Sequence, residues 1–203
     1  MTRGCLLACV RRPRLCRCAA GLTVLAAVVG CGKAPREQLG YSLATPQGWQ
    51  PISGASVPLL PGEVLEAYEV PAPSARGSLV ILRSGYLPRT QPKELLAQTR
   101  YLFLNLPEMK IQSEELVEVG GEAGIRFEVT GQGTGRNLSP TGLGKPIPPA
   151  GEKQLPTRRV WIRVPRGVEQ GTLEIFYHVP EADRAALAPA FDEVLRSLRI
   201  RPS

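Results

Sequence analysis

The sequence predicts an α+β domain in which helices cover an antiparallel sheet. Most of the chain consists of short segments with alternating apolar and polar residues, several of them close enough together to form hairpins. Two longer segments instead carry apolar residues at helical spacing. The 203 residues contain no internal repeat. A chain of this length can bury one substantial core, so we expect a single layered domain over residues 41–203.

The first part of this domain is expected to hold three strands. Residues 41–49 alternate, then turn and end at Trp49, which we expect in the core. Residues 63–70 place three apolar side chains on one face: Val64, Tyr68 and Val70. Residues 78–84 form a nearly continuous apolar run, which is typical of a central strand covered on both faces.

A helix is predicted over residues 91–106, because Pro92 suits its first turn and a row of apolar residues at helical spacing follows. Residues 111–131 predict a hairpin that turns at two consecutive glycines. Residues 157–165 and 172–180 alternate again and are separated by a short turn. Residues 181–200 carry an apolar stripe that predicts a second helix packed on the sheet: Leu187, Phe191, Val194, Leu195 and Leu198.

Residues 132–156 interrupt this pattern. They contain five glycines, five prolines and no aromatic residue. A segment of this composition cannot build a core of its own, so we expect a loop within the single domain. Loops of this length in compact domains are commonly functional or disordered.

The N-terminal segment resembles a secretory signal. Residues 1–30 contain five arginines and no acid, and residues 18–30 are uncharged and mostly apolar. These 13 residues would span about 20 Å as a helix, which is shorter than the ~30 Å hydrocarbon core of a bilayer. A membrane span is therefore disfavoured. A buried helix and a twin-arginine export signal are the other interpretations, and the general secretory signal fits better.

The end of this segment predicts a lipid anchor. Val28-Val29-Gly30-Cys31 resembles a bacterial lipobox, in which cleavage after Gly30 leaves Cys31 as the first mature residue. The resemblance implies a diacylglycerol on the Cys31 thiol and a third acyl chain on its amine, enough for stable anchoring. No other cofactor is expected. Gly32 in place of an aspartate implies that the protein is located at the periplasmic face of the outer membrane. Residues 31–40 would form a tether that extends at most about 32 Å beyond Cys31.

Charge and cysteine content exclude several classes of function. The net charge is +7, but without residues 1–30 the chain carries 20 basic and 18 acidic side chains. No polybasic surface remains, so we expect no nucleic-acid partner. All five cysteines lie within the first 31 residues. The folded domain therefore has no disulfide and no cysteine metal site.

The ionisable residues do not assemble an obvious catalytic set. His178 is the only histidine, and alternation places it beside Phe176 and Glu174 on one face of its strand. A hydrolase would need His178 together with Asp183 or Asp192, and Ser56 lacks the setting of a nucleophile elbow. We therefore predict no catalytic residue, no metal and no enzymatic activity, and a strand histidine whose hydrogen bonds are satisfied.

One row of residues remains as a candidate for partner binding. Arg159, Trp161 and Arg163 occupy alternate positions, so their side chains lie on one face, where guanidinium groups can stack on the indole. Such a row could contact an anionic or aromatic partner. Alternatively a helix covers it and Trp161 belongs to a second core layer. The second interpretation is favoured, since a layered sheet needs both faces covered.

Two stretches resemble the PsbP-like family, which includes extrinsic photosystem subunits and small bacterial lipoproteins. They are YSLATPQGW at residues 41–49 and FDEVLRSLRI at residues 191–200. The resemblance implies an α/β/α sandwich with no shared catalytic set. We therefore expect a membrane-anchored accessory, scaffold or partner-binding module that binds an envelope protein. A carrier of a small apolar ligand is the alternative, and a hydrolase is the weakest hypothesis.

Overall fold

The computed structural model describes five stretches of the chain: residues 40–52, 62–85, 91–106, 108–133 and 155–201. The chain divides into two compact units, Met1–Lys33 and Ala34–Ser203, and every described residue belongs to the second. Cys31 and almost all of the expected tether lie outside the described residues. Within these stretches, no helix has both the length and the apolarity that crossing a bilayer requires.

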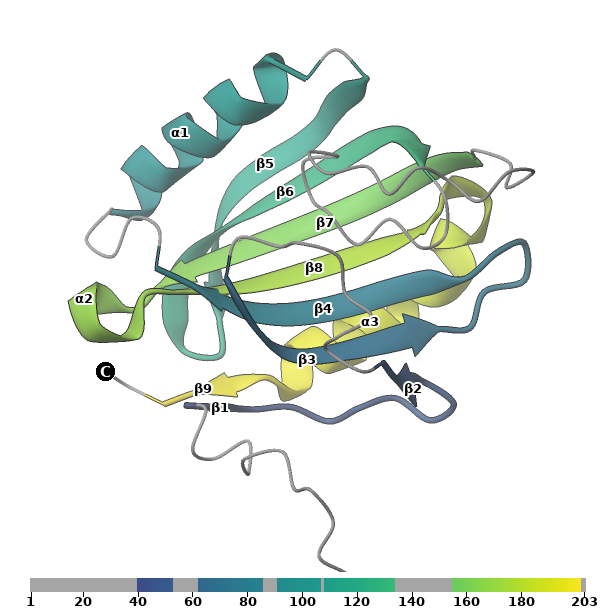
Figure 1. Ribbon diagram of the computed structural model, residues 1–203, viewed down its shortest axis with the longest axis horizontal. Helices are drawn as coiled ribbons and strands as arrows, with labels where there is room; N and C mark the ends of the chain where they lie inside the picture. The colour runs from purple at the N-terminus through teal and green to yellow at the C-terminus, as the bar shows by residue number, and fades with distance from the viewer. Residues whose placement is uncertain (1–39, 53–61, 86–90, 107, 134–154, 202–203) are drawn as a thin grey trace, which may run out of the picture. The chain divides into compact units, whose positions relative to one another are not determined.

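The described residues form a seven-stranded sheet in the order β2-β3-β4-β8-β7-β6-β5 (Figure 1). All neighbouring strands in it are antiparallel. In chain order the strands are β2 (Gln50–Pro51), β3 (Glu63–Val70), β4 (Gly77–Ser84), β5 (Met109–Val119), β6 (Glu122–Gly133), β7 (Leu155–Pro165) and β8 (Thr172–Pro180). The predicted antiparallel sheet is therefore confirmed.

Helices cover the two faces of this sheet. Helix α1 (Pro92–Leu104) lies over β5 and β6 on one face, and α3 (Arg184–Ser197), preceded by the short 3-10 helix η3 (Glu181–Asp183), lies on the other (Figure 1). Pro92 occupies the first turn of α1, as predicted. The short helix α2 (Gly167–Gln170) connects β7 to β8. The structure is thus the expected α+β sandwich.

The core on the α3 side is organised around a stack of three aromatic rings. Tyr177 lies 6.2 Å from Trp49 and 4.0 Å from Phe191, measured between ring centroids, and both pairs are nearly parallel. Burial of the Tyr177 phenol raises its pKa above the ordinary value, with a smaller contribution from the Asp192 carboxylate. The prediction that Trp49 is a core residue is confirmed, because its side chain is buried.

Two predicted elements differ from the structure, each because of strand pairing. The register of β3 shifts between Val64 and Glu66, and this bulge places Val64 opposite Leu82, on the α1 side. Its assignment to the same face as Tyr68 and Val70 was therefore wrong. The second helix ends at Ser197, not at residue 200, because Leu198 is extended and Arg199–Ile200 forms β9.

Strand β9 pairs with β1 (Tyr41–Ser42) in a separate two-stranded sheet. Of the first expected strand region, residues 41–49, only residues 41–42 form a strand, and residues 50–51, which follow it, form β2. The ends of the Gly/Pro-rich segment also differ from the prediction, because residues 132–133 extend β6 and residues 155–156 begin β7. Residues 134–154 lie outside the described residues.

The β1–β9 sheet is held by one arginine. The Arg166 Nη1 donates a hydrogen bond to the Gly40 carbonyl at 3.0 Å, and its Nη2 donates to the Arg201 carbonyl. The backbone N–H of Arg201 also donates to the Gly40 carbonyl at 3.0 Å. Gly40 and Arg201 therefore lie next to each other, beside the turn that follows β7.

Candidate functional site

Strands β7 and β8 place three pairs of side chains opposite one another on the α1 side of the sheet. Because side chains alternate along a strand, every second residue of each strand contributes to this face. We call these six residues the β7–β8 row, and its pairs are Arg159 with His178, Trp161 with Phe176, and Arg163 with Glu174. The predicted sharing of one face by Arg159, Trp161 and Arg163 is confirmed, as is the placement of His178 with Phe176 and Glu174.

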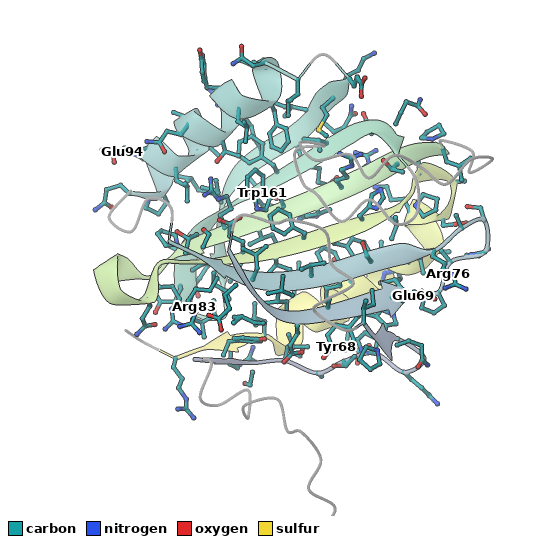
Figure 2. The ribbon with its side chains drawn as sticks, in the orientation of Figure 1. Tyr68, Glu69, Arg76, Arg83, Glu94 and Trp161 are labelled. Carbon is teal, nitrogen blue, oxygen red and sulfur yellow. The ribbon has the colours of Figure 1, made fainter. Side chains whose placement is uncertain are left out.

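The row is an inner layer of the protein. Arg159, Trp161 and Arg163 are only 4%, 6% and 6% exposed. Phe103 of α1 meets Trp161 edge-on, with ring centroids 5.7 Å apart, and Figure 2 shows Trp161 on the side of the sheet that α1 covers. Of the two sequence-based interpretations, the structure therefore has the covered layer. A role of these residues in partner binding stays a prediction.

At one end of the row, Arg163 pairs with a buried acid, although its own Nε is buried without a hydrogen-bond partner among the described residues. Its Nη2 lies 3.3 Å from Oε1 of Glu174, and its guanidinium carbon lies 4.7 Å from the centre of the Trp161 ring. Arg163 Nη1 donates to Thr99 Oγ1 of α1 at 3.0 Å. Glu174 also accepts hydrogen bonds from Trp161 Nε1 at 3.0 Å and from Ser84 Oγ. A buried ion pair is stabilising only when its other hydrogen-bonding groups are satisfied, and here both carboxylate oxygens of Glu174 and both Nη atoms of Arg163 have partners.

At the other end, Arg159 has no ion-pair partner among the described residues. Its Nη2 donates to the Gln132 carbonyl at 3.0 Å, and its Nη1 lies 3.8 Å from Met109 Sδ, a weak acceptor. The Nε is buried without a hydrogen-bond partner. Burial lowers the pKa of Arg159 to about 10, against a smaller opposing effect of the Glu108 carboxylate.

His178 is equally buried, at 4% exposed, and neither ring nitrogen has a hydrogen-bond partner among the residues that the structure describes. Burial lowers its pKa to about 3, and the positive charge of Arg159 adds to this effect. The imidazole is therefore neutral at physiological pH. The prediction that His178 lies on a strand is confirmed, but the prediction that it is satisfied was wrong for the described residues.

The residues of the hydrolase hypothesis are not assembled in the described part of the chain. Asp183 accepts hydrogen bonds from the Ser74 backbone N–H at 3.0 Å and from the Ser74 hydroxyl, and the His178 ring makes no hydrogen bond within the described part of the chain. Ser56 lies outside the described residues. Within those residues, no three His, Cys, Asp or Glu side chains are grouped so that they could hold a metal ion.

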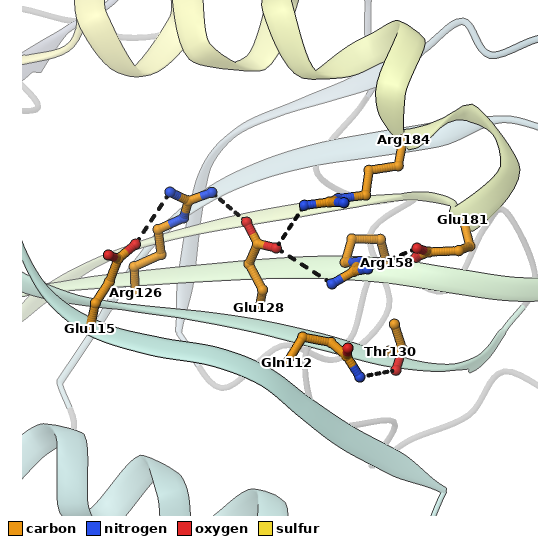
Figure 3. Close-up of polar contacts among 8 residues, drawn as sticks. All are labelled: Gln112, Glu115, Arg126, Glu128, Thr130, Arg158, Glu181 and Arg184. Carbon is orange, nitrogen blue, oxygen red and sulfur yellow. Dashed lines mark hydrogen bonds and ion pairs between the residues drawn. The ribbon is translucent and has the colours of Figure 1, made fainter.

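A second polar cluster lies on the opposite face and was missed by sequence reasoning (Figure 3). Arg158 makes a bidentate pair with Glu181, with Nε–Oε2 and Nη2–Oε1 distances of 2.9 and 2.8 Å. This pair raises the pKa of Arg158 and lowers that of Glu181. Glu128 lies between Arg126 at 2.5 Å, Arg158 at 3.5 Å and Arg184 at 3.4 Å. The cluster joins β6 and β7 to the start of α3.

The large exposed apolar side chains of the described residues gather on two neighbouring elements. Tyr101 and Leu104 of α1 are 72% and 71% exposed, and Leu116 of β5 is 49% exposed. Arg100 of α1 forms an ion pair with Glu114 of β5, and its Nε donates to Glu114 Oε2 at 2.8 Å. Strand β5 ends the sheet and pairs only with β6 among the described strands (Figure 1). We call Tyr101, Leu104 and Leu116, together with β5, the α1–β5 edge.

Comparison with known proteins shows likeness of fold alone. No model of a protein family matches the sequence, and no curated protein matches it. Among solved structures, PA94 of Pseudomonas aeruginosa, a protein of unknown function, is 17% identical with a TM-score of 0.51, over 72% of this chain and 88% of that one. LpqN of Mycobacterium tuberculosis, involved in cell envelope biogenesis, is 13% identical with a TM-score of 0.51, over 80% and 83%. Cyanobacterial PsbP from Synechocystis is 15% identical with a TM-score of 0.46, over 80% and 88%.

Proposed function

We propose that the protein is a lipid-anchored, non-enzymatic accessory protein of the cell envelope that binds another protein through its α1–β5 edge. In this proposal, cleavage after Gly30 exposes Cys31, which carries the acyl chains. The lipobox-like sequence and the short tether support the anchor. The envelope role of the structural neighbour LpqN is consistent with this location.

The observation that carries the binding role is the exposed apolar surface of the α1–β5 edge. Protein interfaces are enriched in aromatic and large apolar residues at their centres, and clustered exposure of such residues marks interaction sites. Tyr101 and Leu104 are more than two-thirds exposed on a helix whose other face is packed in the core. Leu116 extends this surface onto β5 of the sheet edge.

The absence of an enzymatic role is supported by the state of the titratable residues in the β7–β8 row. His178 is neutral and buried, and Glu174 is bound by an arginine, an indole and a hydroxyl. Glu174 is thus occupied by partners within the fold, and a neutral imidazole without an acid beside it in the described part of the chain lacks the partner that a catalytic base needs.

The partner-binding role is tested by affinity capture from envelopes, using the full chain. Replacing Tyr101 and Leu104 by serine should reduce recovery of the partner at least tenfold, because both side chains would lie at the centre of the interface. The matched control is Gln98→Ser, an exposed position of the same helix. Equal recovery with the double variant and the control would contradict the proposal.

The anchor is tested separately by intact-mass analysis of the native protein. Cleavage before Cys31 should remove residues 1–30 and add the mass of the acyl chains to the remainder. Cys31→Ser should abolish both changes and release the protein from membranes. An unmodified chain that still carries residues 1–30 would contradict the anchor without affecting the interface.

A further inference from the structure

The Arg159 end of the β7–β8 row holds a buried positive charge that forms no ion pair with the described residues, and the Glu108 carboxylate only partly offsets the effect of its burial. Arg159 is as buried as Arg163, which pairs with Glu174. Within the described stretches, the guanidinium of Arg159 contacts one backbone carbonyl and one thioether as hydrogen-bond acceptors. Buried charges in proteins are almost always paired, because removing an ion from water costs several kcal/mol. We therefore expect Arg159 to bind an anionic partner.

His178 lies directly opposite Arg159 and shares its shortage of partners. Among the described residues, both ring nitrogens of His178 and the Nε of Arg159 are buried without a hydrogen bond. The Nε of Arg163 is also unpaired, so the feature particular to this end is the unpaired imidazole opposite the arginine. A neutral imidazole has one N–H donor, and the guanidinium Nε is a second donor. Two unpaired donors on one face of adjacent strands suit an acceptor with two oxygens.

The surroundings of this pair are apolar. Val129 lies opposite Arg159 on β6, and Phe176 lies on the same face of β8 as His178. Both belong to the α1-side core, to which Met109 also packs. One cation in an apolar layer balances one negative charge, which favours a carboxylate over a doubly charged phosphate.

We propose that Arg159 and His178 bind the carboxylate headgroup of an amphipathic molecule with an apolar body, such as a medium-chain fatty acid. The guanidinium supplies the charge and one donor, and the imidazole supplies the second donor. The apolar side chains around the pair contact the body of the ligand. This site depends neither on the lipid anchor nor on the α1–β5 edge.

The single histidine makes a direct test feasible. The full chain carrying Cys31→Ser, labelled with nitrogen-15 on histidine and kept in a nonionic maltoside detergent, gives one imidazole to observe by NMR. It is titrated at pH 7 with octanoate, with acetate and with inorganic phosphate. Octanoate should shift the imidazole resonances and saturate at a concentration at least tenfold below acetate, and phosphate should have no effect.

Arg159→Met should abolish the octanoate shift, and Arg159→Lys should weaken binding about tenfold, because lysine keeps the charge but loses the planar donors. Arg76→Met is the matched control, since Arg76 is exposed and paired with Glu69, away from the row. No shift with octanoate, equal responses to all three anions, or an octanoate shift that persists in Arg159→Met would each overturn the proposal. If Arg159→Met does not fold, native mass spectrometry decides through the presence or absence of an octanoate adduct on the Cys31→Ser chain.

Discussion

Arg159 and Arg163 lie four residues apart on the same face of β7 and are nearly equally buried, yet they have different surroundings. Arg163 faces Glu174 across the strand pair, whereas Arg159 faces His178. Trp161 and Phe176 lie between the two pairs, with ring centroids 5.1 Å apart. The two ends of one row thus offer an internal comparison between a buried arginine with an acid and one without.

The comparison shows that the residue opposite on the neighbouring strand determines how a buried arginine affects the stability of the fold. The energetic cost of burial is similar for both guanidinium groups, since both lie in the same layer. At Arg163 the cost is offset by the carboxylate of Glu174 and by Thr99. At Arg159 the offset among the described residues is one carbonyl bond, a weak thioether contact and a smaller effect of the Glu108 carboxylate, which is why we propose an external anion there.

The largest loss of stability is expected at the Arg163 end of the row. Arg163→Met removes the only described cation bound to Glu174 and leaves a buried carboxylate without its counter-charge. We expect a loss of about 3–5 kcal/mol in the free energy of unfolding, measured by urea denaturation at pH 7. The control Arg76→Met breaks an exposed ion pair with Glu69 and should cost less than about 1 kcal/mol. Equal losses for both variants would contradict the assignment of Arg163.

At the Arg159 end of the row, we expect a substitution to raise the free energy of unfolding instead of lowering it. Arg159→Met removes a buried charge without stranding an acid of the described residues, and methionine preserves much of the apolar packing. The free energy of unfolding should rise by on the order of 1–3 kcal/mol, measured as above. A destabilisation similar to that of Arg163→Met would mean that Arg159 is balanced within the chain.

The pH dependence of stability follows from His178. Its pKa is lowered from 6.5 in the unfolded chain to about 3 in the folded protein, so below pH 6.5 the unfolded state binds the proton first. Stability is therefore complete above pH 6.5 and falls on acidification, by at most about 1.4 kcal/mol per pH unit. Denaturation curves between pH 6.5 and 5 should show this slope, and His178→Phe should flatten it. An unchanged slope in the variant would show that other groups cause it.

Acidification below pH 5 also affects a second group, the Glu181 carboxylate. The lowered pKa of Glu181 arises first from its hydrogen bonds with Arg158. This carboxylate stabilises the fold above its unfolded pKa of about 4.5 and loses that contribution as the pH falls further. Glu181→Gln should therefore reduce stability slightly at pH 7, by about 1 kcal/mol or less, because the pair is partly exposed. A Glu181→Gln variant that is as stable as the parent at pH 7 but less stable at pH 3 would contradict this pH dependence.

The sequence predicted the faces of the row but not its pairs. Alternation alone places Arg159, Trp161 and Arg163 together, because the side-chain period of a strand is two. The partner of each residue depends on the register between β7 and β8, which residues between the strands decide and which no local pattern encodes. Thr99 and Ser84 reach Glu174 and its arginine from α1 and β4, so their contribution required the complete fold.

The fold was predicted to a similar extent. Both long helices and the long strands of the sheet follow from periodicity, whereas the bulge at residues 64–66 and the β1–β9 pair do not. Ile200 is buried against Tyr41, at the far end of the domain sequence, and this distant contact overrides the helical spacing of residues 181–200. Local propensity is a weak guide where tertiary pairing competes with it.

A double-mutant cycle tests the central comparison most directly. His178→Glu gives Arg159 the acid that Glu174 provides for Arg163, at the same cross-strand position. In unfolding measurements at pH 7, His178→Glu should be tolerated with Arg159 present and strongly destabilising in the Arg159→Met background, with a coupling free energy above about 2 kcal/mol. The same substitution should also prevent octanoate binding. Equal effects of His178→Glu in both backgrounds would contradict the conclusion that Arg159 lacks only an anion.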